Sequence, residues 1–139
     1  MIKAIIIDAG GVLFQNYAGE GQLNEALLKL LESYKPTMKL GVISSTSYDL
    51  KDILDKSDLI PFFDLVMTTG ETGLDKARPE IYAKAAKILG LPESEIIFID
   101  NESQYIEAAA EAGMKTIYYS DFESCKEQLL KILVKENSC

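Results

Sequence analysis

Short apolar stretches alternate along the chain with segments in which apolar residues recur at helical spacing. The apolar stretches are rich in isoleucine, valine and leucine, which is typical of buried strands. They lie at residues 2–7, 40–43, 65–68, 96–99 and 116–119. Helical spacing marks residues 23–31, 48–54, 80–89, 102–112 and 122–134. The pattern therefore predicts five strands interleaved with five helices.

This alternation predicts an α/β fold of the doubly wound, Rossmann-like kind. Strands joined through helices need right-handed crossovers, which give a mostly parallel five-stranded sheet between two layers of helices. A chain of 139 residues has room for about one domain, so we expect residues 1–139 to form a single core domain. In such sheets the ligand crevice lies outside the carboxyl ends of the strands.

Polar residues follow the predicted strands at that edge. Asp8 ends the first strand, Ser44 the second and Asp100 the fourth. A carboxylate at the end of a buried strand is costly unless a cation or hydrogen bonds compensate it. The position of Asp8 therefore predicts a positive partner opposite it. The alternative is that Asp8 or Asp100 only caps a following turn or helix.

The composition removes several classes of site. Histidine is absent, which excludes His-dependent triads and His-rich zinc sites, and two cysteines cannot close a structural zinc site. The net charge of −8 argues against a nucleic-acid surface. Residues 1–14 are too short and too charged for a signal peptide or a membrane span. We expect a cytoplasmic protein with no membrane contact and no disulfide framework.

The two carboxylates at neighbouring strand tips predict a metal site. Like charges a few ångströms apart share a proton or bind a cation, and hard oxygen ligands favour Mg²⁺, which takes further oxygens from water and from a phosphate group. Ser44 supplies a hydroxyl, and residues 45–49 open a predicted helix whose N–H groups could receive phosphate oxygens, although a simple N-cap explains that segment too. Lys76, in the loop before Pro79, could place its ammonium over the same anion or could be solvated.

Four segments taken together resemble the haloacid dehalogenase (HAD) superfamily of phosphohydrolases. They are residues 5–13 around Asp8, residues 40–45 ending in Ser44 and Ser45, Lys76 with residues 78–82, and residues 96–101 leading to 107–114. The resemblance implies that Asp8 is a nucleophile that forms an aspartyl-phosphate and that Ser44 and Lys76 bind the phosphoryl group. It also implies that Asp8, Asp100 and the main-chain carbonyl of Gly10 bind Mg²⁺.

The chain departs from the family pattern at Gly10. Phosphatases of this kind usually carry there a second aspartate, which protonates the leaving oxygen. Loss of a general acid typically costs about 10²–10⁴-fold in rate, so we expect slow turnover of esters with poor leaving groups. Tyr17, Glu20 or Asn101 could replace the missing acid. Two alternatives stay open: a degenerate HAD-fold module that binds phosphate or protein, and a 2-haloacid dehalogenase-like hydrolase.

A second departure is the short spacing between the segments. Asp8 and Ser44 are 36 positions apart and Ser44 and Lys76 are 32 apart, which leaves no room for an inserted cap domain. We therefore expect an open site. An open site favours an extended or macromolecular phosphorylated substrate over an enclosed small one, or an oligomer that supplies a wall. The sequence does not determine the oligomeric state or the substrate.

Overall fold

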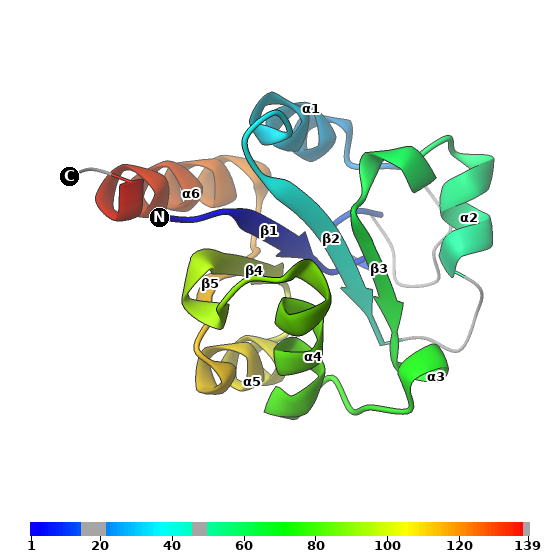
Figure 1. The fold of residues 1–139 in the computed structure, drawn as a ribbon. Coiled ribbons are helices and arrows are strands. Elements are labelled where there is room, and N and C mark those ends of the chain that lie inside the picture. The colour runs from blue at the N-terminus through cyan, green and yellow to red at the C-terminus, as the bar shows by residue number, and fades with distance from the viewer. Residues whose placement is uncertain (15–21, 46–49, 138–139) are drawn as a thin grey trace.

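The five predicted strands form one parallel sheet in the computed structural model, which describes residues 1–14, 22–45 and 50–137. The strands are β1 (Ala4–Ile7), β2 (Lys39–Ser44), β3 (Leu65–Thr68), β4 (Ile96–Asp100) and β5 (Lys115–Tyr118). Their order is β3-β2-β1-β4-β5, and every neighbouring pair is parallel. The doubly wound α/β class predicted from the alternating pattern is confirmed (Figure 1).

Six α-helices lie in the described part of the chain, one more than the pattern predicts. They are α1 (Glu25–Tyr34), α2 (Leu50–Lys56), α3 (Thr69–Thr72), α4 (Pro79–Leu89), α5 (Ser103–Ala112) and α6 (Phe122–Asn137). The additional helix, α3, is a single turn directly after β3, too short for an apolar repeat to reveal it. None of these helices has the length and apolarity needed to cross a bilayer.

The helices cover both faces of the sheet and divide the core into two layers. On one face Ile5 and Ile7 of β1 belong to a buried cluster that includes residues of α1 and α6. On the other face Ile6 belongs to a second cluster built on α4 and α5. Figure 1 shows α1 and α6 on one side of the strands and α4 and α5 on the other. Because β1 is buried on both faces, it reads as a continuous apolar run rather than an alternating one.

The strand order places Asp8 at the centre of the carboxyl edge. β1 pairs with β2 on one side and with β4 on the other, so Asp8, which follows β1, lies between the tips that carry Ser44 and Asp100. The Asp8 amide donates to the carbonyl of Ile99 at 3.0 Å, which keeps it in line with β4. The strand order reverses between β1 and β4, where doubly wound sheets leave their binding crevice.

Candidate active site

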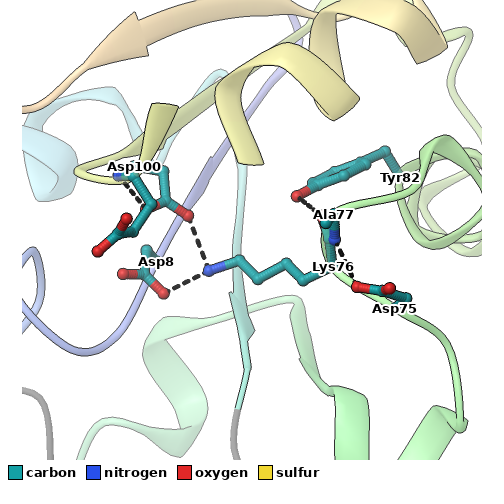
Figure 2. A network of polar contacts seen from close by, with 7 residues as sticks. Asp8, Asp75, Lys76, Ala77, Tyr82 and Asp100 are labelled. Atoms are coloured by element: carbon teal, nitrogen blue, oxygen red, sulfur yellow. Dashed lines mark hydrogen bonds and ion pairs between the residues drawn. The ribbon is translucent and has the colours of Figure 1, made fainter. Parts of the chain in front are cut away.

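Three buried charges meet at the carboxyl edge of the sheet. The ammonium nitrogen of Lys76 lies 2.5 Å from Oδ1 of Asp8 and 2.7 Å from Oδ2 of Asp100 (Figure 2). Lys76 is 1% exposed, Asp100 0% and Asp8 6%. Charges so far from water are tolerated only when they are paired. The cation that the position of Asp8 predicted is thus a side chain of the protein itself.

Lys76 is held from both ends. It lies between α3 and α4, and its main-chain carbonyl accepts a 2.6 Å hydrogen bond from the phenol of Tyr82, a fully buried residue of α4. At the other end, its ammonium lies 4.5 Å from the ring centroid of Tyr105 in α5. A cation is attracted to an aromatic face at this distance. Lys76 is therefore built into the site rather than solvated.

Burial and charge act in opposite directions on the two carboxyl groups. Burial raises the pKa of Asp8 above its ordinary value, the Lys76 ammonium lowers it and the nearby Asp100 raises it. Burial likewise raises the pKa of Asp100, against the lowering effect of Lys76. Two carboxylates and one ammonium leave the cluster one negative charge in excess when all are ionised. The site therefore favours additional positive charge.

A polar pocket of about 200 Å³ opens onto this cluster. Asp8, Gly10, Ser44 and Lys76, all four taken from the sequence as site residues, line it. Asp100 is not among the lining residues and reaches the pocket through its contact with Lys76. The carboxyl ends of β1 and β2 and the loop before α4 thus meet at this pocket.

The candidates for a replacement acid are placed unequally. Tyr17 and Glu20 lie outside the described residues, as do residues 46–49 of the expected phosphate-binding helix start. Asn101 lies against Gly11: a Cβ on Gly11 would fall 2.3 Å from Nδ2 of Asn101. Gly11 also has a φ of 84°, so this position requires glycine on two counts.

Three further lining residues were missed in the sequence. Glu102, Gln104 and Tyr105 come from the segment that leaves β4 and from the first turn of α5, and they form a further part of the pocket wall. A signal for them existed, since the first turn of a helix that follows a strand tip faces the crevice of a doubly wound sheet. The apolar pattern of residues 102–112 gave the helix but not which of its polar side chains face inward.

The residues present fit a magnesium ion. Oδ1 of Asp100 accepts a hydrogen bond from the Glu102 amide at 3.0 Å, whereas the buried Oδ2 makes no hydrogen bond, its 2.7 Å contact with Lys76 being an ion pair without hydrogen-bond geometry. The described residues contain no group of three or more His, Cys, Asp or Glu side chains that could enclose a metal. Two carboxylates and a main-chain carbonyl suit Mg²⁺, which keeps several waters and takes substrate oxygens.

Known proteins resemble this chain in sequence and in fold. Residues 16–119 match the family model described as haloacid dehalogenase-like hydrolase. Enolase-phosphatase E1 of Persephonella marina is 34% identical over 100 residues, 69% of this chain and 43% of its own length. The corresponding protein of Pseudomonas aeruginosa is 32% identical over 117 residues, 78% of this chain and 51% of its own. This chain thus spans about half the length of the curated relatives that it matches.

A solved structure agrees with the fold. A 2-haloacid dehalogenase from Pseudomonas syringae pv. Tomato superposes with a TM-score of 0.80 at 13% identity, covering 97% of this chain and 99% of that one. At that identity the likeness establishes the fold and not the reaction. The sequence match is what assigns the family, because it covers well over half of the chain. The chain belongs to the haloacid dehalogenase-like hydrolases.

Proposed function

We propose that this protein is a Mg²⁺-dependent phosphohydrolase in which Asp8 forms an aspartyl-phosphate. The observation that carries the proposal is the buried Lys76 ammonium in contact with both Asp8 and Asp100. A hydrolase that expelled a halide would not need a metal ligand beside its nucleophile. A second carboxylate beside the nucleophile gives a cation an oxygen ligand, and the shared lysine gives a phosphoryl group positive charge.

In the first half-reaction a carboxylate oxygen of Asp8 attacks phosphorus, and the bond between phosphorus and the leaving oxygen breaks. The Lys76 ammonium already contacts Oδ1 of Asp8, so it is placed to bind a phosphoryl oxygen and to orient the carboxylate. The Ser44 hydroxyl, on the same pocket wall, would donate to another phosphoryl oxygen. Held by Asp8, Asp100 and the carbonyl of Gly10, Mg²⁺ would neutralise charge on the phosphoryl group.

In the second half-reaction water attacks the aspartyl-phosphate, inorganic phosphate leaves and the Asp8 carboxylate is restored. Gly10 offers no proton to the leaving oxygen and no base to the water. The pocket therefore suits substrates whose leaving group departs as an anion, such as acyl or aryl phosphates, better than alkyl esters.

Comparison with relatives supports phosphate over halide. The two bacterial relatives at 34% and 32% identity are both named as phosphatases. A HAD family enzyme from Bacteroides thetaiotaomicron, crystallised with magnesium and inorganic phosphate, superposes with a TM-score of 0.68 at 18% identity, covering 85% of this chain and 94% of that one, so this fold can hold both ions. A pocket of about 200 Å³ is smaller than the roughly 300–1,000 Å³ of ordinary ligand sites, so part of an extended or macromolecular substrate would lie outside it.

The test is release of inorganic phosphate from p-nitrophenyl phosphate and acetyl phosphate, with and without Mg²⁺, by the wild type and by Asp8→Asn. We expect Mg²⁺-dependent release by the wild type and none above background by Asp8→Asn. Release that survives in Asp8→Asn would end the assignment of Asp8 as the nucleophile. A wild type that binds phosphate but releases none would favour the binding-module alternative. Chloride release from 2-chloropropionate would favour the dehalogenase.

A further inference from the structure

The turn that follows Asp8 is a closed, hydrogen-bonded unit, which we call the Asp8 turn (residues 8–14). The Phe14 amide donates to the carbonyl of Ala9 at 2.9 Å, and the Gly11 amide donates to the carbonyl of Phe14 at 2.8 Å. The Leu13 amide donates to the carbonyl of Asp8 itself at 3.3 Å. Because these bonds close the turn on itself, a displacement of its outer part is passed to the main chain of Asp8.

Asn24, just before α1, fastens the outer part of this turn. Its Nδ2 donates to the carbonyl of Val12 at 3.0 Å and to the phenol oxygen of Tyr119 at 2.7 Å. Its Oδ1 accepts from the Leu27 amide at 3.2 Å and so caps α1. Only this orientation of the amide gives every group a partner, since the donors face two oxygens and the acceptor faces an N–H.

Tyr119 carries the connection to the other half of the site. Its main-chain amide donates to the carbonyl of Asp100 at 2.7 Å, while its phenol receives the hydrogen bond from Asn24. Two residues that are 95 positions apart in the sequence thus join the Asp8 turn to the end of β4. The close approach of Gly11 to Asn101 is a second contact between the same two loops.

We infer that Asn24 and Tyr119 are positioning residues that hold the Asp8 turn at a fixed distance from Asp100 and thereby set the affinity of the site for Mg²⁺. The inference rests on the proposed function, in which both carboxylates bind the ion. Asp8 and Asp100 come from different strands, and a turn free to move would have to be ordered each time the cation binds. Outer partners that pre-organise metal ligands typically change affinity by about 10–100-fold. We call the hydrogen bonds of Asn24 with Val12 and Tyr119 the clamp. Loss of one neutral hydrogen bond from this clamp should lower the affinity for Mg²⁺ by a smaller factor, about 5- to 10-fold.

Two substitutions separate the clamp from other roles of the same residues. Tyr119→Phe removes only the phenol oxygen and leaves the ring and the main-chain bond to Asp100. Asn24→Asp keeps an oxygen for the α1 cap, where Asp and Asn serve about equally well, but removes the amide donor to Val12 and Tyr119. Tyr118→Phe is the matched control, because it removes the same atom from the neighbouring residue, which is 49% exposed.

The measurement is the dissociation constant of Mg²⁺ by titration calorimetry on protein stripped of metal, together with amide hydrogen exchange at Gly11 and Phe14. We expect affinity to fall about 5- to 10-fold in Tyr119→Phe and in Asn24→Asp, with faster exchange at both amides. The double variant should lose less than the product of the two single losses, because both break one link. Tyr118→Phe should stay within about twofold of the wild type, as an exposed phenol carries little.

The possible failures are distinguishable. A wild type that binds Mg²⁺ while Tyr119→Phe and Asn24→Asp bind it equally well overturns this inference and leaves the proposed function standing. Equal weakening by Tyr118→Phe overturns it too, because the effect would then be a general loosening. A wild type that binds no Mg²⁺ overturns the metal site, and with it both the proposed function and this inference.

Discussion

A hollow bordered by lysine lies at each edge of the sheet, and the environment of the lysine differs between the two edges. At the amino edge a hollow of about 670 Å³ is bordered by Lys3, Lys35 and Lys39. Lys35 and Lys39 donate to main-chain carbonyls at 2.9 Å, and Lys3 lies 3.9 Å from Glu95 with its side chain 51% exposed. At the carboxyl edge the pocket is about 200 Å³, and its lysine is 1% exposed between two carboxylates.

The comparison shows that burial of charge, and not the size of a hollow, distinguishes the candidate active site from the opposite edge of the sheet. A solvated lysine costs the fold nothing and binds weakly, because water screens it. A buried cluster with unequal charge is costly to keep, and its pairing changes as soon as a cation or phosphate enters. The smaller pocket is therefore the one with a function to test.

The largest expected effect is the loss of activity when Lys76, at the carboxyl edge, is replaced by methionine, and the matched control is the same replacement of a lysine at the amino edge. Lys76→Met should reduce Mg²⁺-dependent phosphate release by about 10³-fold or more, since it removes the positive charge next to the transferred group. Lys39→Met, at the amino edge, should leave the rate within about twofold. The measurement is the rate of phosphate release from acetyl phosphate by both variants, after circular dichroism has shown that they are folded. A similar loss in both variants would remove the distinction between the edges.

A gain of activity is expected from restoring an acid in the pocket. Gly10 does not have a positive φ, so an aspartate fits its backbone, and Gly10→Asp should accelerate hydrolysis of an alkyl phosphate by about 10- to 100-fold. Acetyl phosphate, with its better leaving group, should gain little. Gly11→Asp is the control at the neighbouring position, where the φ of 84° and the contact with Asn101 predict a loss instead. An equal response of the two substrates to Gly10→Asp would contradict the role given to the missing acid.

Burial of the ionised Asp8 carboxylate should lower the free energy of unfolding of the metal-free protein. Burial raises the pKa of Asp8 to about 6, so its stabilising contribution is fully present below the unfolded pKa of about 4 and is lost as the pH rises through about 6. Asn cannot ionise, so Asp8→Asn should be more stable than the wild type by about 1–2 kcal/mol at pH 7.5 and by much less at pH 4. Urea unfolding in EDTA at both pH values measures this. A difference that does not depend on pH would show that Asp8 is not strained by burial.

The smallest effect is expected at the amino edge. Lys3→Ala removes an exposed ion pair of 3.9 Å and should change the free energy of unfolding by less than about 0.5 kcal/mol at any salt concentration. The same urea experiment at low and high salt serves as the measurement. A change of more than about 1 kcal/mol would mean that this edge carries strained charge as well.

Much of the candidate site could be predicted from one rule applied to the sequence. Asp8, Ser44 and Asp100 were found because each ends an apolar strand, and the carboxyl ends of parallel strands meet at one edge. Lys76 carried a weaker signal, since its contact with both acids depends on the path of the segment before α4 and on the hydrogen bond from Tyr82. Neither the path of that segment nor the hydrogen bond can be predicted from the residues next to Lys76.

The other features of the molecule could not be predicted, because they depend on contacts between distant segments or on a single helical turn. Tyr105 lines the pocket from α5. The spacing of apolar residues in that helix predicts which side packs on the sheet, but not which polar or aromatic side chain faces the pocket. The hydrogen bond of Asn24 with Tyr119 joins segments 95 positions apart, and no local pattern marks it. The helix α3 is one turn stabilised by its cap at Thr68 rather than by an apolar face. Sequence periodicity gave the layers and the edge, whereas the pairing of side chains across that edge needed coordinates.

The most direct test of the central claim is to look for the covalent intermediate on Asp8. The protein is mixed with acetyl phosphate and Mg²⁺, quenched in acid, digested and examined by mass spectrometry. The account predicts one phosphoryl group on the peptide that contains Asp8, labile to hydroxylamine and absent from Asp8→Asn. Turnover with no phosphoryl group on Asp8, or with the group on another residue, would contradict it.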